Sequence, residues 1–210
     1  MAKVTAIIPA FNEEATVAAV VDAARRSGVV DKVIVVDDGS TDRTAAEAAA
    51  AGAEVIRLPE NRGKGAAMHA GVEAAGDAEV VVFLDADLIN LRAEQVRALV
   101  EPVVSRRADA TLGVFKGGRN TTDLAQAITP FLSGNRALRR EALEEVDSLA
   151  DSGWGAEVAI TRYLNKHRMR TELVTLSEVT QRTKEEKLGL TKGLAARARM
   201  YWEIIRTTTR

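Results

Sequence analysis

The sequence predicts an α/β fold in which helices flank a mostly parallel central sheet. Short apolar runs rich in Val and Ile alternate with longer alanine-rich stretches, which is typical of parallel strands joined by helical crossovers. Acidic turns follow two of these runs, where the strands should end. With 210 residues and a hydrophobic fraction of 46%, the chain can bury one substantial core, so we expect residues 1–210 to form a single domain.

The first half of the chain contains four expected strands. They lie at residues 4–9, 33–36, 54–58 and 79–84. Helices are expected at residues 13–27, between Ser40 and Gly52, and from residue 65 to residue 75. Ser40 can cap the amino end of the second of these helices, and Gly52 can end it. The continuous apolar run at residues 33–36 suits a strand that is buried on both faces of a sheet.

Beyond residue 87 the alternation becomes less regular. A helix at residues 93–104 and a strand at 110–115 are followed by glycine-rich loops at 117–119, 133–134 and 153–155. Further helices are expected at residues 139–146 and 156–167, with a strand at 171–176. Residues 184–206 have the period of an amphipathic helix, whose apolar face would cover the sheet, form a homodimer seam or contact a membrane surface.

Composition excludes several classes of function. The 29 Lys and Arg residues nearly cancel the 30 Asp and Glu residues, so no overall charge favours nucleic acid. The absence of cysteine excludes disulfides and thiolate zinc sites. No apolar run approaches the roughly 20 residues that span a bilayer, and the first residues lead into an apolar strand rather than a signal peptide, so we expect a cytoplasmic protein with at most peripheral membrane contact.

The acidic motif Asp85-Ala86-Asp87 directly follows an expected buried strand. Open α/β sheets bind ligands at this carboxyl edge. Alternation along the chain places the two carboxylates on the same side, about 6–7 Å apart. They can therefore hold one hard divalent cation, either Mg²⁺ or Mn²⁺, directly or through water. The alternative is a solvated turn.

Two further turns should reach the same edge. Asp37-Asp38-Gly39 ends the second strand, where a carboxylate can accept a hydrogen bond from a uracil imide or a ribose hydroxyl; helix capping is the alternative role for this segment. Pro9-Ala10-Phe11-Asn12-Glu13 closes the first strand in the same plane. Glu13 would otherwise only favour the amino end of the following helix.

Gly63-Lys64-Gly65 opens a helix, so backbone amides and an ammonium group converge where a diphosphate could lie. The spacing matches neither a Walker loop nor a dinucleotide-binding fingerprint, which disfavours ATPases and dehydrogenases. The two histidines, His69 and His167, fall within expected helices and are interpreted as structural. A Ser-His-Asp nucleophile system is not visible in the sequence.

Together these four motifs resemble family 2 glycosyltransferases of the GT-A fold. The resemblance implies that residues 1–115 form a nucleotide-sugar-binding half and residues 116–210 an acceptor-binding half. It also implies a divalent metal on Asp85 and Asp87 and catalytic roles for Lys64 and Asp87. The residues that would contact the nucleotide sugar are Pro9, Ala10, Phe11, Asn12, Glu13, Asp37, Asp38, Gly39, Lys64, Asp85 and Ala86.

The second half of the chain resembles glucosyl-3-phosphoglycerate synthases and, more loosely, polyprenyl-phosphate sugar transferases. The resemblance implies that two loops hold an acceptor phosphate, for which backbone amides and a guanidinium are suited. These acceptor residues are Gly117, Gly118, Arg119, Ser133, Gly134, Asn135 and Arg136. Glu157 matches a position near the transferred sugar, where it would bind sugar hydroxyls, orient the acceptor or act as a base. Gln181 lies near the position at which those synthases place a histidine metal ligand, so its carbonyl oxygen is an expected third ligand.

The sequence therefore predicts an enzyme that transfers a hexose from a UDP- or GDP-sugar to a small phosphorylated acceptor such as phosphoglycerate. Family 2 implies inversion at the sugar, whereas the synthase resemblance implies retention. One alternative is a membrane-surface enzyme that uses polyprenyl phosphate, suggested by basic residues in segment 184–206. Another is a nucleotidyltransferase, although Ala10-Phe11-Asn12 lacks the Gly-rich basic loop of that class.

Overall fold

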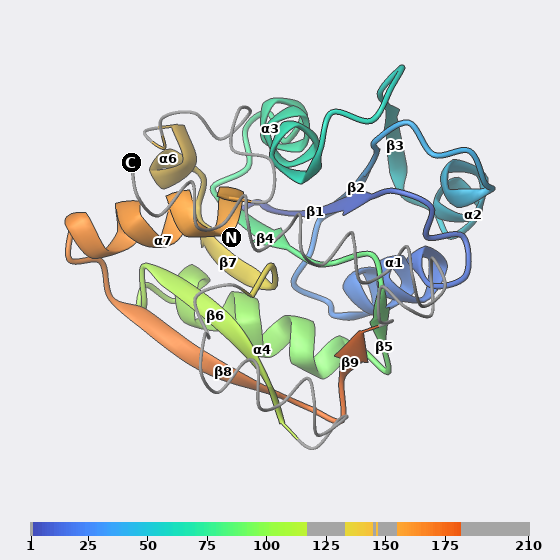
Figure 1. The fold of residues 1–210 in the computed structure, drawn as a ribbon. Helices are drawn as coiled ribbons and strands as arrows, with labels where there is room; N and C mark the ends of the chain where they lie inside the picture. The colour runs from blue at the N-terminus through green and yellow to red at the C-terminus, as the bar shows by residue number, and fades with distance from the viewer. Residues whose placement is uncertain (1, 117–132, 145, 147–154, 182–210) are drawn as a thin grey trace.

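A seven-stranded sheet forms the centre of the protein in the computed structural model, which describes residues 2–116, 133–144, 146 and 155–181 (Figure 1). The strand order is β3-β2-β1-β4-β7-β6-β8. The strands are β1 (Val4–Ala10), β2 (Lys32–Asp37), β3 (Glu54–Arg57), β4 (Val80–Phe83), β6 (Ala110–Lys116), β7 (Arg136–Arg139) and β8 (Thr171–Ser177). The predicted α/β class is confirmed.

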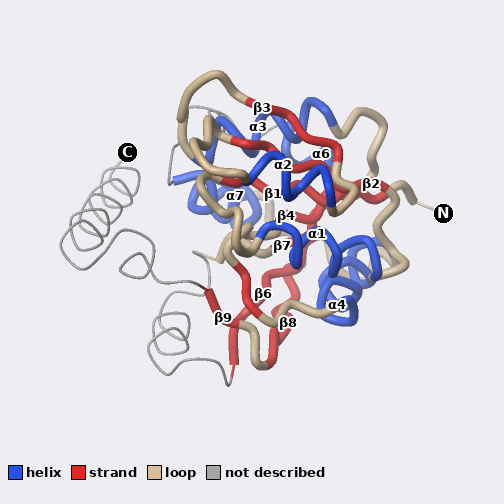
Figure 2. Tube along the Cα trace, turned by 90° about the vertical axis from the view of Figure 1, so that its right-hand side faces the viewer, coloured by secondary structure: helices blue, strands red, loops and turns tan. Residues whose placement is uncertain are grey.

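Strand direction follows the predicted crossovers, with one exception. β1 pairs in parallel with both β2 and β4, β2 pairs in parallel with β3, and β6 pairs in parallel with β8. Only β7 runs antiparallel to its neighbours, β4 and β6, among the strands of this sheet that the structure describes. β6 and β8 lie side by side in both views (Figure 1, Figure 2). The sheet is therefore mostly parallel, as predicted.

Helices cover both faces of the sheet. On one face α1 (Val17–Arg26), α2 (Thr44–Ala50) and α4 (Ala93–Val104) pack against alternate strand side chains such as Ala6 and Ile8. On the other face α3 (Lys64–Ala74), α6 (Arg140–Glu144) and α7 (Ala156–Lys166) pack against Ile7 and Phe83 (Figure 1). Because strand side chains alternate in direction, neighbouring residues such as Ile7 and Ile8 enter different cores. This burial on both faces explains the continuous apolar runs.

Three elements differ from the sequence-based expectation. Residues 136–139 form β7, although the sequence pattern did not predict a strand there, and the helix expected from residue 13 begins at residue 17. A separate two-stranded sheet pairs β5 (Leu88–Ile89) with β9 (Thr180–Gln181) in antiparallel register. This small sheet brings the chain after β8 back to the turn that follows β4. Segment 184–206, expected to be helical, lies outside the described residues.

No helix in the described ranges is long and apolar enough to cross a membrane.

Candidate active site

Several hydrogen bonds join the turns that follow β1 and β2. The backbone N–H of Asn12 donates to Ser40 Oγ at 2.9 Å, and the N–H of Glu13 donates to Thr44 Oγ1 at 2.7 Å. In return, the N–H of Thr41 donates to Asn12 Oδ1 at 2.9 Å. Ser40 and Thr44 thus connect the two turns. Both turns lie at the carboxyl ends of parallel strands, as predicted, where α/β sheets bind ligands.

Asp37 is fully buried at the end of β2. Its Oδ1 accepts the backbone N–H of Ser40 at 2.9 Å, and its Oδ2 lies 3.3 Å from Arg57 Nε. Arg57 also donates to the carbonyl of Ser40 at 2.9 Å. Asp37 therefore shapes the turn after β2, with Arg57 closing it from the neighbouring strand.

Asp38 connects this turn to the start of α3. Its two oxygens accept the backbone N–H groups of Arg62 and Gly63, each at 2.8 Å. Burial raises the pKa of Asp38 above its ordinary value, although the two N–H donors favour the charged form. Gly39 has φ +73°, and a Cβ there would lie 2.6 Å from the carbonyl carbon of Glu60. A glycine is therefore required for these two segments to approach so closely.

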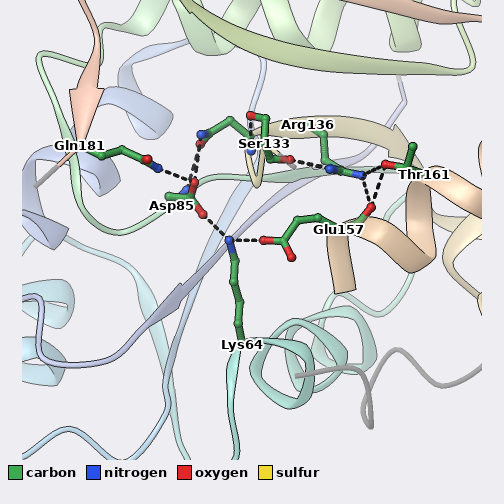
Figure 3. Close-up of polar contacts among 8 residues, drawn as sticks. Lys64, Asp85, Ser133, Arg136, Glu157, Thr161 and Gln181 are labelled. Carbon is green, nitrogen blue, oxygen red and sulfur yellow. Dashed lines mark hydrogen bonds and ion pairs between the residues drawn. The ribbon is translucent and has the colours of Figure 1, made fainter. Parts of the chain in front are cut away.

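Lys64 is the first residue of α3 and lies between two carboxylates (Figure 3). Its Nζ is 2.5 Å from Asp85 Oδ1 and 2.6 Å from Glu157 Oε1. The exposed fractions of the three side chains are 17%, 13% and 7%. Burial lowers the pKa of Lys64, but the charges of Asp85 and Glu157 outweigh burial and raise it above its ordinary value. The structure thus brings together two predicted catalytic residues, Lys64 and Glu157, around the acidic motif.

The other oxygen of Asp85 accepts two side-chain amides. Asn135 Nδ2 donates to Asp85 Oδ2 at 3.1 Å, and Gln181 Nε2 donates to the same oxygen at 2.8 Å. Asn135 Oδ1 also accepts the backbone N–H of Asp85 at 3.0 Å. Gln181 reaches the motif through the pairing of β9 with β5, which follows Asp87 directly. The structure therefore places Gln181 at the acidic motif, where its amide nitrogen binds Asp85; its role as a metal ligand stays a prediction.

The donor chemistry at this motif fits a divalent cation that shares its shell with a ligand. Asp85 and Asp87 supply carboxylates, and the amide of Gln181 has an oxygen as well as a nitrogen. Among the residues that the structure describes, no group of three or more His, Cys, Asp or Glu side chains is arranged to hold a metal ion. Mg²⁺ is usually held by one or two carboxylates together with substrate phosphates and water, so such a site does not need a third acidic ligand.

Gly134, Asn135 and Arg136 lie against the cluster formed by Lys64, Asp85 and Glu157, and Ser133 contacts Arg136. Ser133, Asn135 and Arg136 are buried. The Arg136 guanidinium donates to the carbonyls of Ser133 and Glu157 (Figure 3). The other expected acceptor loop, Gly117-Gly118-Arg119, lies outside the described residues.

The remaining nucleotide-sugar candidates differ in exposure. Phe11 is 44% exposed in the turn after β1, and Asn12 beside it is also exposed. Ala10, Glu13 and Ala86 are buried. The structure therefore leaves Phe11 and Asn12 as accessible side chains of the first turn. Neither histidine belongs to the site: His69 faces Glu73 on α3, and His167 stacks on Tyr163 at the end of α7.

Sequence reasoning did not find Arg57 or Thr161. Arg57 is the register partner of Asp37 in the β2–β3 pair, so a parallel alignment of the two predicted strands could have revealed it. Thr161 lies one helical turn after Glu157 and accepts a hydrogen bond from Arg136 at 3.2 Å. No sequence signal indicated this contact, because it depends on how α7 packs against β7.

Sequence comparison gives the family. The sequence model described as "Glycosyl transferase family 2" matches residues 5–156. The chain belongs to glycosyl transferase family 2. The matched range begins at the second residue of β1, extends past β7 and ends just before Glu157, so it contains the Lys64–Asp85 pair.

Curated relatives of this family 2 chain include several synthases. Glucosyl-3-phosphoglycerate synthase of Mycobacterium tuberculosis is 34% identical over 194 residues, which cover 75% of this chain and 59% of that protein. Glycosyltransferase AglJ of Haloferax volcanii is 30% identical over 186 residues, covering 80% of this chain and 60% of that protein. The chain thus spans less than two thirds of the length of these relatives.

Solved structures agree with this family assignment and with the GT-A fold. The Mycobacterium tuberculosis synthase in complex with Mg²⁺ and uridine diphosphate superposes with a TM-score of 0.77 at 28% identity, covering 99% of this chain and 78% of that one. The same synthase in complex with Mn²⁺, UDP-glucose and phosphoglyceric acid gives a TM-score of 0.74 at 28% identity, covering 98% and 79%. The resemblance to family 2 enzymes of the GT-A fold is therefore confirmed.

Proposed function

We propose that this family 2 chain is a metal-dependent glycosyltransferase that transfers glucose from UDP-glucose to a small phosphorylated acceptor such as phosphoglycerate. The observation that carries the proposal is the position of Lys64, held between Asp85 and Glu157 at the carboxyl edge of the sheet. Structures of a relative contain UDP-glucose, Mn²⁺ and phosphoglyceric acid together, which supports this choice of donor, metal and acceptor.

On the donor side, the reaction breaks the bond between the anomeric carbon and the diphosphate, and the electron pair stays with the departing diphosphate. A divalent cation, when bound, neutralises part of that negative charge. Asp85 and Asp87, with the amide oxygen of Gln181, would hold the cation. The ammonium of Lys64 and the amino end of α3 would also stabilise the negative charge of the diphosphate.

The nucleoside would lie over the turns after β1 and β2. Phe11 is the accessible aromatic side chain of the first turn and can pack against a planar base. Asp37 and Asp38 would act through the backbone that they organise, since both carboxylates are buried. Part of the nucleotide-sugar set proposed from the sequence would therefore contribute through its backbone. That set consists of residues 9–13, 37–39, 64, 85 and 86.

On the acceptor side, an acceptor hydroxyl oxygen forms the new bond to the anomeric carbon and loses its proton. Glu157 would orient the sugar or acceptor hydroxyls, or accept that proton. Its carboxylate lies 2.6 Å from the ammonium that is proposed to face the diphosphate, which supports a role near the bond that breaks. Gly117, Gly118 and Arg119 would hold the acceptor phosphate, for which a guanidinium fork is suited.

The test is a product assay with purified protein, UDP-glucose and 3-phosphoglycerate, with and without MnCl₂. We expect stoichiometric UDP release and a glucosylated acid that form only with metal and acceptor. GDP-glucose and unphosphorylated glycerate serve as controls. Absence of UDP release from UDP-glucose with every acceptor tried, in protein shown to be folded, would refute the proposed activity.

Liposome flotation tests the polyprenyl-phosphate alternative. Protein that stays in solution with anionic vesicles argues against membrane contact by the predicted helix at residues 184–206. Size-exclusion chromatography with light scattering tests the alternative in which segment 184–206 forms a homodimer seam. A cytoplasmic location also stays a prediction.

A further inference from the structure

We infer that residues 133–136 form a positioning element for the Lys64–Asp85–Glu157 cluster. Asn135 fixes Asp85, Arg136 fixes the start of α7 with Glu157, and Gly134 leaves room for the ion pairs. This inference rests on the proposed function. It differs from the sequence-based expectation that the segment contacts the acceptor, because it assigns Asn135 and Arg136 to the site of metal and diphosphate binding.

Asn135 holds both the backbone and the side chain of Asp85. Its Oδ1 accepts the Asp85 backbone N–H at 3.0 Å, and its Nδ2 donates to Asp85 Oδ2 at 3.1 Å. Asn135 itself is held by its backbone carbonyl, which accepts the N–H of Gly113 in β6 at 2.8 Å. The side chain has an exposed fraction of 0%, so it is buried behind Asp85 rather than open to a ligand in solvent. Two bonds to one residue restrict rotation of its carboxylate.

Arg136 joins this segment to α7. Its exposed fraction is 1%, and its Nε donates to the Ser133 carbonyl at 3.1 Å. Its Nη1 donates at 3.2 Å to both the Glu157 carbonyl and Thr161 Oγ1, and Thr161 Oγ1 donates to the same Glu157 carbonyl at 2.8 Å. The guanidinium therefore binds the first turn of the helix that carries the Glu157 carboxylate.

The contacts made at position 136 require a guanidinium group rather than an ammonium group. Burial lowers the pKa of Arg136 to about 10, against the opposing charges of Glu157 and Asp85, so the group stays protonated at neutral pH. Its planar fork donates in several fixed directions at once, whereas a lysine ammonium is a point charge on a flexible stem. Lysine at this position would keep the charge but lose the geometry that spans from Ser133 to α7.

Gly134 passes directly over the Lys64–Asp85 ion pair. A Cβ at this position would overlap both the Asp85 carboxylate and Lys64 Nζ. Any side chain here must therefore push the carboxylate and ammonium away from each other or from the segment. Residues 134, 135 and 136 thus shape the cluster in three ways: Gly134 and Asn135 act on the Lys64–Asp85 pair, and Arg136 acts on the helix turn that carries Glu157.

The test compares Asn135→Asp and Arg136→Lys with the control Arg139→Lys, which lies at the other end of β7. UDP is titrated calorimetrically into each protein with MnCl₂, and KM values are measured separately for UDP-glucose and 3-phosphoglycerate. We expect the first two variants to lose about 10–100-fold in UDP–Mn²⁺ affinity, the range typical when a residue supporting a metal ligand is replaced, with a parallel rise in KM for UDP-glucose. The control should be unchanged in every measurement, and Asn135→Asp should leave the KM for 3-phosphoglycerate unchanged.

The opposite pattern overturns the inference: unchanged UDP–Mn²⁺ affinity with a raised KM for 3-phosphoglycerate assigns the segment to the acceptor. If Arg136→Lys does not fold, as judged by circular dichroism, Asn135→Asp decides the question because it keeps the size of the side chain. Gly134→Ala provides a third variant, with the same expected loss. Failure of the proposed function gives a different result, since the wild-type protein itself would then neither bind UDP with Mn²⁺ nor release it.

Discussion

Replacing Lys64 by Met removes the positive charge between the buried carboxylate of Glu157 and the partly buried carboxylate of Asp85. Because Asp85 Oδ1 and Glu157 Oε1 lie 2.5 Å and 2.6 Å from the same nitrogen, both oxygens stay close together when the charge is gone. At about 5 Å and an effective dielectric constant of about 20, two unit negative charges repel by about 3 kcal/mol. Breaking a buried ion pair by removing one partner typically costs about 3–5 kcal/mol. We expect Lys64→Met to lower the free energy of unfolding by this amount.

The second variant, Lys64→Met/Glu157→Gln, isolates the cause. Glu157→Gln removes one of the two repelling charges, so the double variant should recover about 2–3 kcal/mol relative to Lys64→Met. Urea denaturation at pH 7, followed by circular dichroism, measures all variants provided that the m-value is constant. Lys3→Met is the control, because its ammonium pairs with Asp77 at the exposed surface and its loss should leave stability unchanged. A double variant no more stable than Lys64→Met would refute the electrostatic explanation.

Three further predictions concern the scaffold. Gly71→Ala in α3 places a methyl group against Ile7. The cost of overpacking, about 1–3 kcal/mol, should exceed the gain in helix propensity of about 1 kcal/mol, so the urea midpoint should fall. A higher midpoint contradicts this. Gly39→Ala, at φ +73° and against Glu60, should cost more than about 2 kcal/mol in the same assay, and a neutral result would exclude the close approach. Arg170 lowers the pKa of Asp109 from 3.8 to about 2, so the stability from this pair is present above pH 3.8 and lost as the pH falls through 2. Asp109→Asn should therefore reduce the loss of unfolding free energy between pH 3.8 and pH 2. The same loss in the variant and the wild-type protein, measured by denaturation at several pH values, would argue against this explanation.

The sheet could be predicted from sequence because its strands are buried on both faces. Runs such as residues 80–84 are continuously apolar, and a polar motif follows each where the strand ends. Parallel strands place their carboxyl ends on one edge, so the turns after the predicted strands were expected to lie at the same edge. The ion pair between Lys64 and Asp85 at 2.5 Å depends in addition on the order of the strands in the sheet.

β7 could not be predicted in the same way. It has only four residues, with arginines at both ends, and its buried Arg136 is stabilised by carbonyl groups of Ser133 and Glu157. Glu157 lies 21 residues away, so no local periodicity contains this information. The direct contact of Glu157 with Lys64 was missed for the same reason, since it depends on how α7 packs over the sheet.

The central claim is that the carboxyl edge of the sheet binds a nucleotide diphosphate through a divalent cation at the acidic motif. Calorimetric titration of UDP into the wild-type protein and into Asp87→Asn, each with MnCl₂ and then with EDTA, tests it most directly. The account predicts binding by the wild-type protein only in the presence of Mn²⁺, and a loss of affinity of at least about tenfold in Asp87→Asn. Equal UDP affinity with Mn²⁺ and with EDTA, or in both proteins, would contradict it.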